Sequence, residues 1–124
     1  MEERLKVLVI EKDDMLREKI AGLVSKVEDV KLVGQARSMA NLAGIMWDSR
    51  PDVILFEAGC IRGNEELLAL VRKQAGGVKL VLMTEGEGDG FWRSGMEEKI
   101  SVDAIVDKKK VYQEIVEFIG REYR

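Results

Sequence analysis

The sequence predicts a single α/β domain in which helices cover both faces of a doubly wound, five-stranded parallel sheet. Five short apolar runs rich in β-branched residues alternate along the 124 residues with segments that carry apolar side chains at helical spacing. Continuous apolar runs are typical of strands that are buried on both faces. Parallel strands need a crossover between them, which a helix usually supplies. We therefore expect one domain, residues 1–124, with three layers and a (βα)5 order of elements.

The first half of the chain contains two of the predicted strands, each followed by a predicted helix. Residues 7–10 form the first apolar run, and residues 30–36 form the second. Asp13 and Asp14 stand at the expected start of the first helix, where acidic side chains suit the helix dipole. Ser38 is a candidate N-cap for the second helix. This helix is expected to carry Leu42, Ile45, Met46 and Trp47. Trp47 and the methionines of the chain are expected to pack in the core.

The second half continues the alternation. Residues 53–56 and 78–83 are the third and fourth apolar runs, and a helix that ends near Gly76 lies between them. Residues 91–100 are expected to form a short fourth helix, and residues 104–106 a short fifth strand. The closing helix is expected to bury Val111, Ile115, Phe118 and Ile119. Right-handed crossovers leave few topologies, and the leading choice is the flavodoxin-like strand order 2-1-3-4-5, which binds ligands at the carboxyl ends of its strands.

The composition excludes several classes of function. The net charge of −3, with both signs mixed along the chain, argues against direct nucleic-acid binding. The sequence has no histidine, which removes zinc sites built on imidazole and histidine acid–base catalysts. Cys60 is the single cysteine, so it has no intramolecular disulfide partner, and we expect it to be inert. No apolar run is long enough to cross a bilayer, so we expect a cytoplasmic protein without membrane contact.

Polar side chains follow the predicted strands at their carboxyl ends. Glu11 follows the first strand, and Glu57 follows the third. Thr84 follows the fourth strand, and Lys108 lies shortly after the fifth. Because these ends share one edge of a parallel sheet, we expect the four side chains in one crevice. A phosphoryl-transfer site needs this set: carboxylates hold Mg²⁺ or act as the nucleophile, and a hydroxyl and an ammonium stabilise the transferred oxygens.

Four segments at these strand ends resemble the receiver domain of bacterial response regulators. They are residues 9–13, 51–57, 81–84 and 102–108. Residues 30–36 are also similar to the second strand of receivers that precede helix-turn-helix transcription domains, so the resemblance covers nearly the whole chain. It implies a signalling module of a two-component phosphorelay system and not an enzyme. Its partner would be a protein, either a histidine kinase or an output protein.

Two positions of the acidic pocket depart from the receiver pattern. Glu57 stands at the phosphoacceptor position, where the family has aspartate. Lys12 stands at the second metal-ligand position, between the pocket equivalents Glu11 and Asp13. Glutamate moves the carboxylate by about one C–C bond, roughly 1.5 Å, and positioning is most of what such a site contributes. An ammonium beside the metal repels it, so we expect lost or weak Mg²⁺ binding, no other cofactor, and signalling without phosphorylation.

The switch positions of the resemblance are mixed. Thr84 and Lys108 match the hydroxyl and the lysine of the family, whereas Ile105 replaces its aromatic switch residue. We expect Lys12 and Lys108 to pair with Glu57, with the acid after the first strand balancing the second lysine. The alternative for Lys12 is that its side chain points to solvent. In the paired arrangement, the longer carboxylate would hold the Thr84 loop in an active-like position.

The segment after the fourth strand contains a candidate partner face. Phe91 and Trp92 are adjacent large aromatics, so we expect one of them on the surface formed by helix 4, strand 5 and helix 5. The receiver family uses that surface for partners or for homodimers. The alternative is that both rings pack under the segment. Residues 84–90 are rich in glycine, but their acidic side chains oppose phosphate, so we reject a phosphate-binding loop.

Two other functions remain open at this point. The first is a working receiver of a histidine-to-aspartate phosphorelay, in which Asp13 accepts phosphate and the chain is the N-terminal part of a transcription regulator. The second is a small flavodoxin-like enzyme or nucleotide binder, which ranks last because the sequence lacks a glycine fingerprint for nucleotides. The sequence leaves open the partner, the oligomeric state, and whether Glu57 mimics an active or an inactive state.

Overall fold

The computed structural model describes residues 4–85 and 102–123, and the helix expected at residues 91–100 lies outside them. The strands are β1 (Leu5–Ile10), β2 (Val30–Ala36), β3 (Val53–Glu57), β4 (Lys79–Thr84) and β5 (Ala104–Asp107). The helices are α1 (Asp14–Ser25), α2 (Leu42–Ser49), α3 (Glu65–Gln74) and α6 (Val111–Tyr123), with short 3-10 turns η1 (Ala58–Cys60) and η2 (Lys108–Lys110). All neighbouring strands are parallel in the order β2-β1-β3-β4-β5, which confirms the predicted flavodoxin-like sheet.

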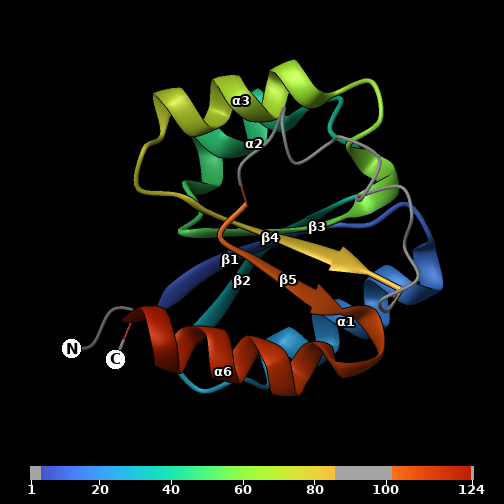
Figure 1. Ribbon diagram of the computed structural model, residues 1–124, viewed down its shortest axis with the longest axis vertical. Helices are drawn as coiled ribbons and strands as arrows, with labels where there is room; N and C mark the ends of the chain where they lie inside the picture. Colours follow the sequence, from blue (N-terminus) through green and yellow to red (C-terminus); the bar gives the residue numbers. More distant parts are fainter. Residues whose placement is uncertain (1–3, 86–101, 124) are drawn as a thin grey trace.

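The described helices form two layers around the sheet. Figure 1 shows α2 and α3 on one face and α1 and α6 on the other. The three-layer arrangement follows from the right-handed crossovers between parallel strands. Helix α6, which follows β5, lies beside α1. Because all the strands are parallel, their carboxyl ends all lie at one edge of the sheet.

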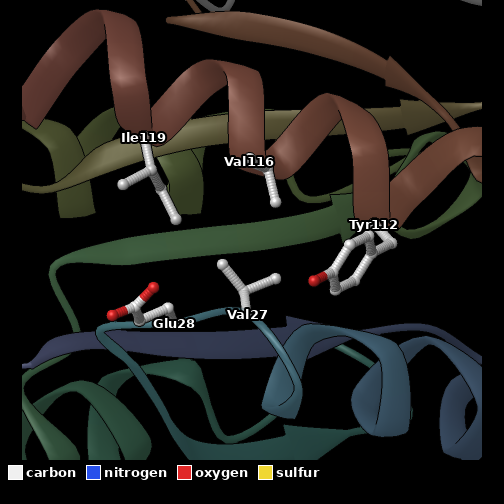
Figure 2. Close-up of a pocket in the computed structure, with 5 residues that line it drawn as sticks. All are labelled: Val27, Glu28, Tyr112, Val116 and Ile119. Atoms are coloured by element: carbon white, nitrogen blue, oxygen red, sulfur yellow. The ribbon is translucent and has the colours of Figure 1, made fainter.

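A small groove lies between α6 and the loop that follows α1. Figure 2 shows Tyr112, Val116 and Ile119 projecting from α6 toward Val27 and Glu28. The space between them is about 140 Å³. Pockets for small-molecule ligands and cofactors usually measure about 300–1,000 Å³, so this groove is too small for a typical cofactor.

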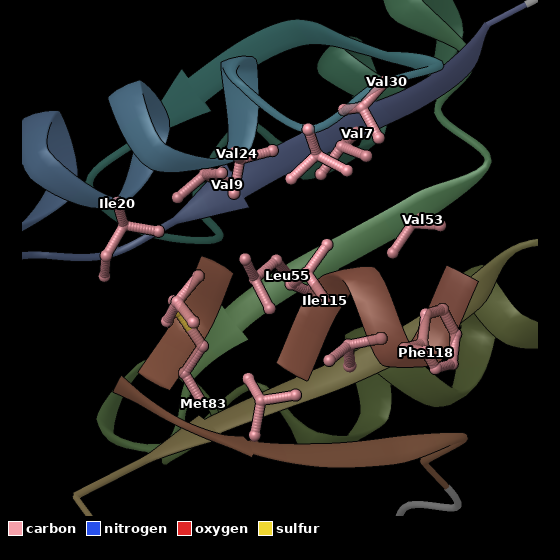
Figure 3. Packing of buried hydrophobic residues seen from close by; sticks show 14 of the residues in the cluster. Val7, Val9, Ile20, Val24, Val30, Val53, Leu55, Met83, Ile115 and Phe118 are labelled. Carbon is pink, nitrogen blue, oxygen red and sulfur yellow. The ribbon is translucent and has the colours of Figure 1, made fainter. Parts of the chain in front are cut away.

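Each face of the sheet has its own hydrophobic core. Side chains alternate across a strand, so Leu8 and Ile10 face α2 and α3, whereas Val7 and Val9 face α1 and α6. Figure 3 shows the second of these cores, in which Phe118 from α6 packs against strand residues of the sheet. Burial on both faces explains why the central strands are continuously apolar.

The register of the strands brings the predicted site residues to one edge. Ile10 pairs with Phe56 in the β1–β3 ladder, so Glu11, directly after β1, and Glu57, the last residue of β3, lie side by side at that edge. Thr84 ends β4. Its ladder partner on β5 is Asp107, the residue immediately before Lys108. The topological switch point between β1 and β3 thus becomes an acidic edge with a lysine opposite.

Trp47 and Met15 are exposed, so their predicted place in the core was wrong. Trp47 is 75% exposed and Met15 is 84% exposed. With about 100° between successive helical residues, Trp47 lies roughly 140° around α2 from the buried Leu42, and Met15 lies roughly 140° around α1 from the buried Ile20. Neither helix can bury both positions. The guanidinium of Arg50 lies 5.7 Å from the centre of a Trp47 ring, a cation–π contact at the surface.

Helix α2 begins later than predicted. Its N-cap is Asn41, which makes no side-chain cap bond, and its first residue is Leu42. The Ser38 hydroxyl instead accepts a hydrogen bond from the Ala40 N–H at 3.2 Å, within the turn that precedes the helix. The buried Met39 explains the delay, because this turn directs its side chain into the core before the helix starts.

An ion pair that the sequence did not suggest ties α3 to the segment before β5. Arg72 Nη1 and Nη2 lie 2.6 and 2.9 Å from the two carboxylate oxygens of Asp103, a bidentate arrangement. The same carboxylate accepts the Leu80 N–H at 2.8 Å. Burial alone would raise the pKa of Asp103, but the bonds from Arg72 and Leu80 outweigh it, and the pKa lies below its usual range.

We expect Asp103→Asn to lower the free energy of unfolding by about 2 kcal/mol at neutral pH, because charge-assisted hydrogen bonds are lost. A lowered folded-state pKa means that this stabilisation is present above the unfolded pKa, about 3.9, and disappears as the pH falls toward the folded pKa. Urea unfolding at pH 7 and at pH 3 measures both effects. The control Asp48→Asn, at an exposed residue of α2, should change the free energy by less than about 0.5 kcal/mol. Equal losses in the two variants would contradict the prediction.

Candidate functional site

The Lys108 ammonium lies among three carboxylates at the carboxyl edge of the sheet. Its Nζ is 3.1 Å from Glu11 Oε1, 3.6 Å from Glu57 Oε1 and 3.7 Å from Glu85 Oε1. The Lys108 and Glu11 side chains are 9% and 2% exposed, whereas that of Glu85 is 76% exposed. The predicted convergence of Glu11, Glu57 and Lys108 in one site is therefore present, with Glu85 at its rim.

Both oxygens of the buried Glu11 carboxylate have partners. Oε1 contacts the Lys108 ammonium, and Oε2 accepts the Asp13 N–H at 3.0 Å. The Glu11 backbone carbonyl accepts a hydrogen bond from Arg17 Nη1, also at 3.0 Å. A buried carboxylate is costly unless it is paired and hydrogen-bonded. Lys108 and the backbone of the α1 N-terminus together supply this compensation.

The carboxylates hold Lys108 in its charged form. Burial by itself lowers the pKa of the Lys108 ammonium. Glu11, through a direct contact and its charge, together with the charges of Glu57 and Glu85, outweighs burial and raises that pKa above its usual range. The site therefore contains a fixed positive charge at neutral pH.

Glu57 has a second partner that the sequence analysis missed. The Cys60 thiol donates a hydrogen bond to Glu57 Oε2 at 3.4 Å, so the two carboxylate oxygens have different partners. Burial, and next the charge of Glu57, raise the pKa of Cys60 to about 12. The thiol therefore stays protonated, which agrees with the expectation that it is unreactive. The only sequence signal was the short spacing between Glu57 and Cys60, which one turn of η1 brings together.

Lys12 does not take the place predicted for it. Its side chain is exposed, and the ion pairs of the described residues include none between Lys12 and Glu57. The prediction that both lysines pair with Glu57 was wrong for Lys12 and right for Lys108. Because Glu11 turns into the interior at the end of β1, the next residue turns outward.

Asp13 acts as a helix cap and not as a pocket acid. Its side chain accepts the Leu16 N–H at 2.9 Å at the N-terminus of α1. N-cap aspartates stabilise helices because they satisfy one of the free N–H groups of the first turn. Its backbone N–H, rather than its carboxylate, is what Asp13 contributes to the site.

The remaining predicted residues differ in their placement. Thr84 is buried at the end of β4, on the same edge as the acidic site. Ile105 lies on the edge strand β5 and is 46% exposed. Phe91 and Trp92 lie outside the described residues.

The described residues show neither a group of metal ligands nor a helix that could span a membrane. Within residues 4–85 and 102–123, no three Cys, Asp or Glu side chains are grouped so that they could hold a metal ion. None of the helices in these ranges is long and apolar enough to span a bilayer. The groove in Figure 2 shares no lining residue with the acidic site.

The chain resembles known response regulators in sequence. Over 89 residues it is 32% identical to the response regulator GacA of Pseudomonas aeruginosa. The match covers 70% of this chain and 41% of GacA, so the chain spans less than half the length of that relative. No protein-family model matches the sequence.

Solved receiver domains share the architecture. The signal receiver domain of NarL from Mycobacterium tuberculosis matches 97% of this chain and 96% of its own, with a TM-score of 0.77 and 20% identity. The non-phosphorylated receiver domain of RcsB from Escherichia coli has a TM-score of 0.76 at 11% identity, covering 94% of this chain and 91% of its own. The response regulator domain of Thermotoga maritima CheB has a TM-score of 0.76 at 18% identity, covering 95% of both. The sequence relative and the common architecture place this chain in the response-regulator family, as a receiver domain.

Proposed function

We propose that this receiver domain signals without phosphorylation, through contact with a protein partner. The observation that carries the proposal is Glu57 at the phosphoacceptor position, with Oε1 3.6 Å from Lys108 Nζ and Oε2 3.4 Å from the Cys60 thiol. A phosphoryl acceptor needs a carboxylate oxygen that is free to attack. Here both oxygens of the carboxylate already have partners within the chain.

The donor set fits a divalent cation poorly. Mg²⁺ requires near-octahedral oxygen ligands, often one or two carboxylates and water. Glu11 is engaged by Lys108 and by the Asp13 N–H, and the exposed Lys12 stands where the family has a metal ligand. A bound metal would have to displace a buried ion pair and stand beside an ammonium. We therefore propose that the domain does not use Mg²⁺.

The position of Glu57 also opposes attack on phosphorus. An in-line attack needs a free carboxylate oxygen in a defined place. Glu57 Oε1 faces Lys108, and Oε2 accepts a hydrogen bond from the Cys60 thiol. The carboxylate of Asp13, the alternative phosphate acceptor, accepts a hydrogen bond from the Leu16 N–H. These contacts favour the phosphorylation-independent function over a working phosphorelay receiver.

The proposed partner is a protein of a two-component pathway, either a histidine kinase or an output protein. GacA, the matched relative, is a response regulator more than twice as long as the matched segment. The exposed Ile105 on the edge strand β5 supports a contact face that includes strand 5. A homodimer through that face is an alternative occupant of the same surface. We propose a cytoplasmic, non-enzymatic module.

We expect no acyl phosphate on this chain after incubation with acetyl phosphate and Mg²⁺. The reason is that the carboxylate oxygens of Glu57 are already paired. Intact-mass measurement, with a phosphate-accepting receiver as positive control, detects the modification. Phosphate located on Glu57 or Asp13 by peptide mapping would refute the proposed function.

We expect Glu57→Asp combined with Lys12→Asp to create measurable Mg²⁺ binding and acyl-phosphate formation. The double change shortens the acceptor and exchanges an ammonium for a metal ligand. Mg²⁺ titration followed by tryptophan fluorescence should saturate for the double variant and stay flat for the original chain, which has two tryptophans. The two single variants are the controls. Saturable binding by the original chain would contradict the proposal that it does not use Mg²⁺.

We expect Lys108→Met to lower the free energy of unfolding by about 3 kcal/mol, because Glu11 then stays buried without its counter-charge. A folded-state pKa above the usual lysine value, about 10.4, means that the Lys108 contribution is full below that pH and disappears as the pH rises through the folded pKa. Denaturant unfolding from pH 7 to pH 11 measures it. Lys109→Met, at an exposed neighbour, is the matched control, with less than about 0.5 kcal/mol expected. A similar loss in both variants would argue against the buried ion pair.

A further inference from the structure

Gly59 lies directly under the carboxylate of Glu57. A Cβ added at Gly59 would be 2.7 Å from Glu57 Oε1, 3.0 Å from Oε2 and 3.2 Å from Cδ. These distances are shorter than ordinary van der Waals contacts, which begin near 3.4 Å for such pairs. A side chain at position 59 would therefore need the carboxylate end of Glu57 to move, and with it the contacts of that carboxylate with Lys108 and Cys60.

The backbone does not explain the glycine. Among the described glycines, Gly63 has the positive φ, 82°, that favours glycine. Gly59 lies in the 3-10 turn η1 with φ outside that range, where an alanine is conformationally acceptable. The feature specific to this glycine is thus the close approach of the Glu57 carboxylate, which an added Cβ would displace.

Cys60, the next residue, fixes the same carboxylate from the other side. Its thiol is the donor to Glu57 Oε2 at 3.4 Å, and the residue is 7% exposed. The Arg37 carbonyl, at 3.9 Å from Sγ, is a longer alternative acceptor. A protonated thiol suits the carboxylate, because a thiolate there would place two negative charges side by side.

We infer that Gly59 and Cys60 form a seat for glutamate at position 57, Gly59 by leaving the volume that the carboxylate fills and Cys60 by donating a hydrogen bond to it. An aspartate at position 57 would end about 1.5 Å short of this seat, the length of one C–C bond. The seat therefore selects glutamate over aspartate. The inference deepens the proposed function, because it names the residues that position Glu57 against Lys108. Its meaning for signalling rests on that proposed function.

A double-mutant cycle tests the contact between Gly59 and Glu57. On the original chain, Gly59→Ala should lower the folding equilibrium constant roughly tenfold, as overpacking does. On the Glu57→Asp background, the same change should be neutral or raise the constant by about two- to fivefold, because alanine restricts the unfolded chain. Gly76→Ala, where an added Cβ meets nothing, is the control for the glycine change itself.

If Gly59 had only a general structural role, aspartate at position 57 would not restore the stability that Gly59→Ala loses. If Gly59→Ala does not fold on the original chain, folding of the Glu57→Asp, Gly59→Ala double variant is itself the expected rescue. The same loss on both backgrounds, or failure of both proteins to fold, would overturn the seat.

The thiol provides a spectroscopic signature of the other half of the seat. The chain has one cysteine, so infrared spectra contain a single S–H stretching band. We expect the band to move to higher wavenumber in Glu57→Asp and in Gly59→Ala, because each change takes the carboxylate away from the thiol. An unmoved band in both variants would overturn the role of Cys60 and assign its proton to the Arg37 carbonyl.

The two proposals fail in different experiments. Acyl phosphate on the original chain would refute signalling without phosphorylation and leave the coupling between Gly59 and Glu57 intact. Additive effects in the cycle would refute the seat, whatever the phosphodonor experiment shows. The folding and infrared measurements need neither a phosphodonor nor a partner protein.

Discussion

The buried contact between the Lys108 ammonium and the Glu11 carboxylate is the interaction on which the site depends. Each charge would be unfavourable in the interior without the other, and the Asp13 N–H completes the hydrogen bonding of Glu11. Their partnership also sets the electrostatics of Glu57, which faces the same ammonium. Lys108 matches the receiver pattern, so the feature that sets this site apart is Glu57, whose two carboxylate oxygens contact Lys108 and the Cys60 thiol.

The parallel sheet makes this contact possible across a long sequence separation. Glu11 ends the first strand of the chain and Lys108 follows the last, yet strand order and register bring both to one edge. The Arg72–Asp103 ion pair fastens the opposite end of β5 to α3 and so helps to fix the strand from which Lys108 projects. Topology brings the charges to the same edge, and local contacts then decide which of them pair.

Apolar periodicity was sufficient to predict the strands, the sheet order and the edge where Glu11, Glu57 and Lys108 meet, because buried parallel strands leave a clear one-dimensional pattern. It was not sufficient for Trp47. This residue lies about 140° around α2 from Leu42, and a short apolar cluster does not show which side of the helix faces the core. The outward orientation of Lys12 follows from the burial of its neighbour Glu11, which the apolar pattern does not reveal. The Cys60 contact with Glu57 depended on a 3-10 turn, which has no strong sequence signature.

The missing side chain at position 59 has an evolutionary consequence. With glutamate at position 57, a larger residue at position 59 would push the carboxylate away from Lys108 and Cys60, because the added Cβ would meet the end of that side chain. The two positions are therefore expected to be epistatic: the effect of a substitution at one depends on the residue at the other. Replacement of Glu57 by aspartate would likewise leave an unfilled space beside Cys60.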